Sequence, residues 1–214
     1  MPSVFEVRKR INQAQPEYFR MILTDLYLKA GRISESISIK APADTTTVYG
    51  PTGTDASIED IEGHEAVVIQ VKTAKRKGKE RLIALPTETE PWAKPLYNYY
   101  RSFGDQPVFP FTRQYIWVKA KELFEGYSYE ILAYTIKKND IIEERPIHNL
   151  RATLHFLRHL RATELVRFYH FKAEDLAAYC GWKLQTVSHA SSVMERYVDL
   201  GAYVEYFPKL LKKR

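Results

Sequence analysis

The chain has 214 residues, of which 45% are hydrophobic and 27% charged, so it is long enough to bury a sizeable core. Its 32 basic residues outnumber its 26 acidic ones, and the net charge of +6 suits a polyanionic partner. A single cysteine, Cys180, excludes an internal disulfide framework and a cysteine-based zinc site. With no apolar run of membrane length and no signal-peptide pattern, we expect a cytoplasmic location and no membrane partner.

Helical spacing of apolar residues extends from Phe5 to about Ala30, with a break at Pro16. The second of these predicted helices ends at Ala30-Gly31, where glycine favours a stop or a sharp turn. Directly after it, Arg32 and Glu35 stand three residues apart. This spacing is typical of an ion pair at the start of a helix, but it also places an arginine at a turn.

Residues 41–64 combine turn-forming glycines with a diffuse acidic run, Asp55, Glu59, Asp60 and Glu62. Such a run is usually a solvated loop, and we predict a loop here. A carboxylate cluster that binds a metal ion, as in nucleases, is the functional alternative.

Two segments of strand composition, 65–72 and 81–85, flank residues 73–79 and predict a β-hairpin. Its end is basic, because it carries Lys72, Lys75, Arg76, Lys77 and Lys79. Either this tip is a solvated turn, or its cations lie against the phosphodiester backbone of a nucleic acid.

The remaining pattern is mainly helical, so the sequence predicts an α+β fold with a small antiparallel sheet. A short strand is expected over 130–136 and a basic tail over 209–214. Helices are expected over about 91–103, 111–125, 147–171, 173–179 and 191–200.

The segment from His155 to Thr163 places titratable and permanently charged side chains at helical spacing inside an apolar pattern. His155 and Arg158 are three residues apart and share a helix face, where they suit a phosphate group. The ordinary alternative is a solvated or ion-paired face. Zinc is disfavoured, because Phe156 stands where a zinc protease has glutamate and Arg158 would repel a cation.

Several motifs stand in the order of the tyrosine recombinase (phage integrase) catalytic domain, which the chain resembles from about residue 15 to 207. Ala-Gly-Arg32-Ile-Ser-Glu resembles the first arginine box, and His155-Phe-Leu-Arg158-His159, followed by Ala-Thr, resembles the second. Cys180-Gly181-Trp182 resembles the later box, and Met-Glu-Arg-Tyr197 resembles the nucleophile box. The residues of these motifs are similar to those of archaeal and archaeal-virus integrases.

The resemblance implies site-specific DNA recombination or integration through a 3′-phosphotyrosyl intermediate, with no cofactor and no metal. It assigns catalysis to Arg32, Lys72, His155, Arg158, Trp182 and Tyr197. It also implies double-stranded DNA as the partner, association with the nucleoid, and a tetramer on two DNA sites, with a monomer in isolation. For DNA binding we assign Lys75, Arg76, Lys77, Lys79 and Arg161.

The resemblance leaves three assignments open. His148-Asn-Leu-Arg151 also spells His-x-Leu-Arg, but Arg158 lies closer to the family spacing from Gly181. Lys75 competes with Lys72, which we prefer because it ends the predicted strand. Tyr203 and Tyr206 compete with Tyr197, since the distance from Trp182 to Tyr197 is longer than the family habit.

The whole chain is expected to form a single catalytic domain, without the amino-terminal core-binding domain that family members carry. Residues 203–214 are then the candidate tail that docks onto a neighbouring protomer, with a basic frayed end as the alternative. A domain with the recombinase fold that binds DNA but has lost catalysis is the second functional hypothesis.

Overall fold

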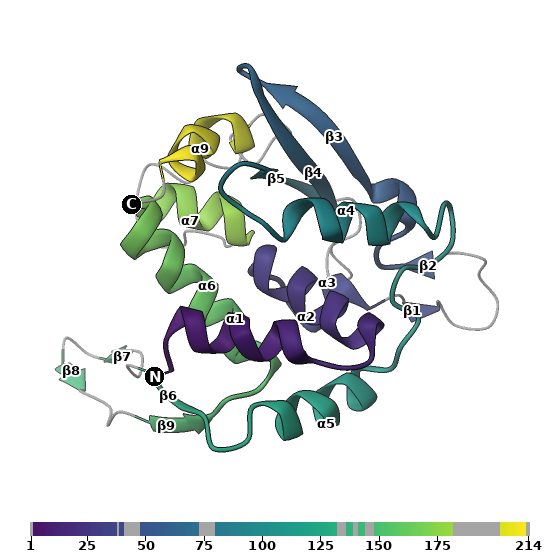
Figure 1. The fold of residues 1–214 in the computed structure, drawn as a ribbon. Helices are drawn as coiled ribbons and strands as arrows, with labels where there is room; N and C mark the ends of the chain where they lie inside the picture. The colour runs from purple at the N-terminus through teal and green to yellow at the C-terminus, as the bar shows by residue number, and fades with distance from the viewer. Residues whose placement is uncertain are drawn as a thin grey trace.

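The computed structural model describes residues 2–37, 39–40, 48–72, 80–131, 136–138, 141–143, 148–181 and 202–212, and these form an α+β fold (Figure 1). Helices α1 (Val4–Gln13) and α2 (Glu17–Leu28) open the chain, and the predicted break at Pro16 is confirmed. Ser3 and Glu6 form a reciprocal capping box that begins α1. A single turn of helix, α3 (Ile33–Ser36), and a two-stranded ladder of β1 (Ile39–Lys40) with β2 (Val48–Tyr49) follow.

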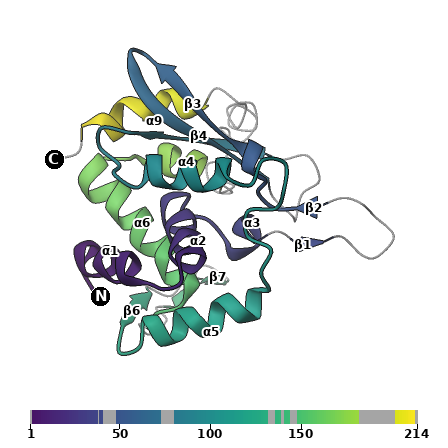
Figure 2. The ribbon, with the colours of Figure 1, turned by 45° about the vertical axis from the view of Figure 1, so that its right-hand side comes forward.

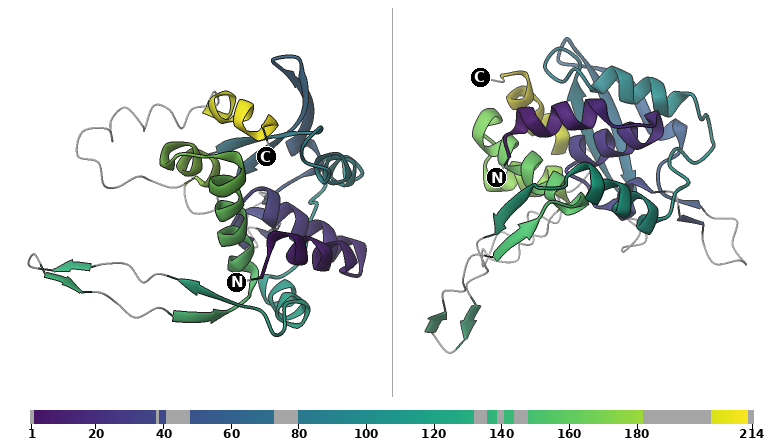
Figure 3. Two further views of the ribbon diagram at one scale, coloured as in Figure 1. Left: turned by 60° about the vertical axis from the view of Figure 1, so that its left-hand side comes forward. Right: turned by 60° about the horizontal axis from the view of Figure 1, so that its bottom comes forward.

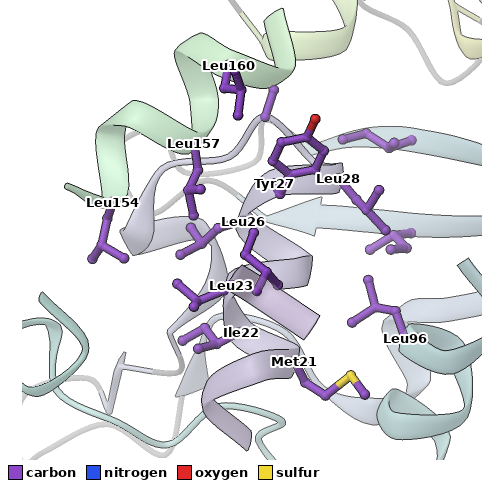
Figure 4. Close-up of a cluster of buried hydrophobic side chains, with 14 of the residues drawn as sticks. Met21, Ile22, Leu23, Leu26, Tyr27, Leu28, Leu96, Leu154, Leu157 and Leu160 are labelled. Carbon is purple, nitrogen blue, oxygen red and sulfur yellow. The ribbon is translucent and has the colours of Figure 1, made fainter. Parts of the chain in front are cut away.

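Helix α2 is the centre of the core, because nine of its twelve residues are buried. Helix α6 (Leu154–Tyr169) lies across it. Figure 4 shows leucines of α6 directed at α2 from above: Leu154, Leu157 and Leu160 face the side of α2 that carries Ile22, Leu23 and Leu26. Burying each of these side chains contributes about 1.5–3 kcal/mol, so this contact is a main source of stability.

The principal sheet has three antiparallel strands in the order β3 (Ala56–Ile61), β4 (His64–Lys72) and β5 (Glu80–Pro86). The predicted strands over 65–72 and 81–85 are confirmed. The predicted loop over 41–64 is wrong at 56–61, which pair with β4 along their whole length. An edge strand tolerates charged side chains. Glu59 and Asp60 therefore made the sequence of β3 resemble a solvated loop.

Helices α4 (Ala93–Arg101) and α9 (Ala202–Leu211) cover opposite faces of this sheet (Figure 2). On the face toward α2 and α4, Val67, Ile69 and Val71 join the main core. On the other face, Val68 and Ala84 pack with Phe207 of α9 in a second cluster. Thr112 caps the start of helix α5 (Arg113–Leu123), because its side chain accepts a hydrogen bond from the Tyr115 amide. Both α4 and α5 were predicted.

Two short antiparallel ladders are the least expected part of the fold. In one, β6 (Ser128–Ile131) pairs with β9 (His148–Arg151), and in the other, β7 (Ile136–Lys138) pairs with β8 (Ile141–Glu143). Figure 3 shows β7 and β8 lying apart from the helices. The predicted helix from 147 is therefore wrong at its start, because 148–151 form a strand and α6 begins at Leu154. The strand predicted over 130–136 corresponds in part to β6.

The carboxy-terminal helix packs on the chain's own sheet. Its Phe207 and Leu210 are fully buried, and Lys209 forms an ion pair with Asp175 of α7 (Ala173–Cys180). The frayed-end alternative is therefore wrong for 202–211. The predicted helix over 191–200 lies outside the described residues. Within the described part of the chain, no helix has the length and apolarity needed to cross a membrane.

Replacing Phe207 with alanine should lower the free energy of unfolding by about 3–5 kcal/mol, because it removes the buried ring that joins α9 to the sheet. Urea unfolding measures this change. Phe5→Ala is the matched control, since Phe5 is 76% exposed and its loss should matter by less than about 0.5 kcal/mol. Equal effects of the two substitutions would contradict the packing of α9.

Candidate functional site

Arg158 of α6 joins two segments that are far from it in the sequence. Its Nη1 donates a hydrogen bond to the Ala30 carbonyl oxygen at 2.7 Å, and its Nη2 donates to the Cys180 carbonyl oxygen at 2.9 Å. The side chain is 3% exposed. The turn after α2, the middle of α6 and the end of α7 thus meet at one guanidinium. Arg151, the arginine of the alternative His-x-Leu-Arg motif, instead lies in β9 opposite Ser128.

The turn between α2 and α3 is shaped by its backbone. Ala30 has a left-handed φ of 44°, and the Gly31 amide donates to the Leu26 carbonyl oxygen at 2.9 Å, which ends α2. Arg32 is the N-cap of α3, and Glu35 accepts a hydrogen bond from the Arg32 amide at 3.0 Å. The hydrogen bond from the Arg32 amide to Glu35 holds the start of α3, and the Arg32 side chain is 49% exposed.

Glu35 is a carboxylate at 3% exposure held by two arginines. Arg32 Nη1 lies 3.3 Å from its Oε1, and Arg81 Nη2 lies 3.0 Å from its Oε2. Burial alone would raise the pKa of Glu35, but the charge and hydrogen bond of Arg81 and the Arg32 amide hold it below its usual value. Glu35 is therefore ionised near neutral pH and fixes Arg32.

His155 and His159 stand one helical turn apart on α6, with ring centroids 4.7 Å apart and ring planes at 85°. Burial lowers the pKa of both imidazoles, and the positive charge of Arg158 lowers both further. His155 also feels the charge of Arg32. Both rings are thus neutral near pH 7, and the exposed His155 can accept a proton there.

Arg81 was missed as a site residue, although it was placed at the start of a predicted strand. It is 7% exposed and directed at Glu35. One signal was available in the sequence: Arg81, Ile83 and Leu85 alternate on one strand, which places Arg81 on the buried face. A buried cation on that face implies a buried carboxylate opposite it.

Lys72 ends β4 and forms an ion pair with Asp55, its Nζ lying 2.6 Å from Asp55 Oδ1. Asp55, in the 3-10 turn η1 (Gly53–Asp55), also accepts from the Thr52 amide at 2.8 Å. Asp55, the first carboxylate of the acidic run, is therefore already paired with a lysine. Among the residues that the structure describes, no three His, Cys, Asp or Glu side chains lie together as a metal site, so the nuclease alternative gains no support.

The assignment of Arg161 to DNA binding is wrong, because its side chain is 1% exposed. Its Nη1 lies 3.1 Å from Glu90 Oε2, and it also pairs with Glu164. Arg8 donates to both oxygens of Glu90, at 3.0 and 2.9 Å, and Tyr27 donates to Glu164 at 2.8 Å. This internal ion network joins α1, α2, α6 and the segment before α4.

For the other residues that we expected in the site, the side chains lie outside the described part of the chain. The basic tip residues and two catalytic candidates lie outside it: Lys75, Arg76, Lys77, Lys79, Trp182 and Tyr197. Tyr203 and Tyr206 belong to α9, but their side chains are not among the described parts of the structure.

The geometry concentrates positive charge around one carboxylate. Arg32, Arg81 and Arg158 surround Glu35, and two neutral histidines adjoin Arg158. A surface of this kind can bind an oxyanion, with Arg32 supplying exposed donors and His155 accepting a proton.

Comparison of the chain with protein-family models, with curated proteins and with solved structures finds no match.

The internal ion network should make folding stability fall in acid. Burial would raise the pKa of Glu164, but the charges of Arg161 and Arg8 lower it to about 2. A carboxyl with a lowered folded-state pKa stabilises the fold above its unfolded value of about 4.3, and that contribution disappears as the pH falls through the folded-state value.

Urea unfolding between pH 6 and pH 2.5 should therefore show a steep loss of stability below about pH 4.3. Glu164→Gln should flatten this dependence, whereas Glu17→Gln, which alters a largely exposed carboxylate, should leave it unchanged. A parental slope in the Glu164→Gln variant would contradict the role of the network.

Proposed function

We propose that this chain cleaves and rejoins double-stranded DNA without a metal, as the catalytic domain of a tyrosine recombinase or integrase does. One observation carries the proposal: Arg158 donates to the carbonyl oxygens of Ala30 and Cys180. Three motifs that resemble the recombinase boxes are thereby brought together, although they are spread over most of the chain. The proposal includes the recombinase fold, which the α+β arrangement is compatible with.

The proposed reaction begins with attack of the Tyr197 phenolate on the scissile phosphorus. A free tyrosine has a pKa of about 10, so ionisation at pH 7 costs about 4 kcal/mol, and a base near the phenol is needed. His155 supplies that base, consistent with the lowered pKa of its imidazole. Negative charge on the non-bridging oxygens is stabilised by the exposed guanidinium of Arg32 and by the positive charge of the buried Arg158.

The 5′ oxygen then leaves the phosphorus and takes a proton from Lys72, while a phosphotyrosyl bond forms at the 3′ side. The Trp182 indole N–H donates to a non-bridging oxygen. Attack by a 5′ hydroxyl on phosphorus reverses each step and releases the tyrosine. Because one phosphodiester is exchanged for another, rejoining needs no external energy source.

Binding of DNA is assigned to the basic tip of the β4–β5 hairpin, with Lys75, Arg76, Lys77 and Lys79 against backbone phosphates. The net charge of +6 supports a polyanionic partner. Exchange of strands between two duplexes requires four protomers, and association with the nucleoid follows from the substrate.

A second candidate is a DNA-binding domain of the same fold without catalysis. It is favoured by the burial of Arg158, whose 3% exposure and two carbonyl partners also suit a structural role.

A covalent adduct separates the two candidates. Incubation with supercoiled plasmid in EDTA at low salt should give relaxed circles and a detergent-resistant protein–DNA adduct, whereas Tyr197→Phe should give neither. This needs no knowledge of the target sequence. Tyr203→Phe and Tyr206→Phe are the matched controls, and loss of the adduct in one of them alone would move the nucleophile there. Failure of the parent to form any adduct would favour the non-catalytic domain.

Arg158→Lys should lower the rate of adduct formation by at least about 100-fold, since one ammonium cannot reproduce a guanidinium that stabilises an oxyanion. Affinity for DNA, measured by fluorescence anisotropy, should change little. Arg167→Lys, at an exposed position of the same helix, is the control and should keep parental rates. Near-parental cleavage by Arg158→Lys would sink the proposed role.

A further inference from the structure

The buried carboxylate of Glu35 is shared between one arginine that the motifs single out and one that they do not. Arg32 belongs to the turn after α2, whereas Arg81 comes from β5, and both bind Glu35. Arg81 Nη2 also lies 3.4 Å from the Lys29 carbonyl oxygen. Arg81 therefore connects the sheet to the end of α2 and to α3, the two segments on either side of Arg32.

The position of Arg81 is constrained on its other side by the end of α7. A Cβ atom on Gly181 would lie 3.0 Å from Arg81 Nη1, and Gly181 has a left-handed φ of 64°. Glycine at this point leaves room for the guanidinium. Arg81 thus occupies a narrow place between α7 and α3, where a shift of its side chain would be transmitted to Glu35.

Several charged or titratable groups face Glu35, and their contributions differ. Lys29 Nζ donates to the Glu35 backbone carbonyl at 3.2 Å but pairs its charge with Asp25 at 2.6 Å. Burial raises the pKa of the Cys180 thiol to about 11, so the thiol is neutral near pH 7. The cations that act on the carboxylate are Arg32, Arg81 and Arg158, of which Arg81 lowers its pKa most.

We propose that Arg81 is a positioning residue for Arg32: it holds the Glu35 carboxylate in place and ionised, and Glu35 in turn fixes the exposed Arg32 guanidinium for the phosphate. This inference rests on the proposed DNA strand transfer. A half-exposed arginine has many rotamers, and anchoring it before substrate binds lowers the entropic cost of using it. Arg81 itself, at 7% exposure, acts through Glu35.

The test removes the charge of Arg81 and follows Glu35 directly. In Arg81→Met, carboxyl NMR should show the pKa of Glu35 raised by at least about one unit, because an opposite charge within contact distance has been lost. The pH at which the rate of adduct formation falls on the acid side of its profile (the acid limb) should rise with this pKa, since protonated Glu35 no longer binds Arg32. An ion pair with a merely structural role would lower stability without moving this limb.

Two further variants sharpen the test. Arg81→Lys keeps the charge and should leave the acid limb near its parental pH. Arg81→Gln is neutral and polar, and it takes the place of Arg81→Met if that variant does not fold. Arg20→Met is the matched control, because it removes an arginine from an exposed pair with Glu17 and should change neither Glu35 nor the rate.

The outcomes for the inference and for the proposed function are separable. An unchanged Glu35 pKa in the neutral variants, or an unchanged acid limb despite a raised pKa, overturns the role of Arg81. If the parent forms no adduct, the proposed function fails. The Arg32 Nε–H signal then still tests the coupling: loss of its ordering in Arg81→Met supports it, and unchanged ordering refutes it.

Discussion

The candidate site depends on one buried arginine that binds the carboxyl-terminal end of one helix and the turn that follows another. The last carbonyl groups of a helix have no partner within it and carry partial negative charge. Ala30 is the second residue after the end of α2, in the turn that follows it, and Cys180 is the last residue of α7. By donating to both carbonyl oxygens, Arg158 compensates its own burial and fixes the relative position of two helices. The charge that the proposed chemistry requires is thus also structural.

Helix α6 carries a buried charged stripe as well as an apolar one. Arg158, Arg161 and Glu164 recur every three residues and are all buried. Arg158 connects the helix to the site, and the other two belong to the ion network of Arg8 and Glu90. Buried ions are tolerated only when each has a partner, and here each has at least one. The helix is therefore held on both sides by its buried charges.

Periodicity and turn chemistry predicted the elements whose buried residues are mainly apolar, such as α2, β4 and β5. They failed where charge occupies a buried or edge position. Glu59 and Asp60 hid the edge strand β3, and arginine at a helical position suggested a surface for Arg161. Strand β9 was mistaken for helix because its pairing with β6 depends on residues about twenty positions away. Local sequence does not contain such partners.

The partners of Arg158 also determine when the site can form during folding. Its guanidinium needs the carbonyl of residue 30 and the carbonyl of residue 180, and α2 must pack against α6 before they meet. Contacts of this sequence separation are slow to form, and they appear late during synthesis from the amino terminus. A nascent chain therefore has no assembled cationic centre until residue 180 has been made.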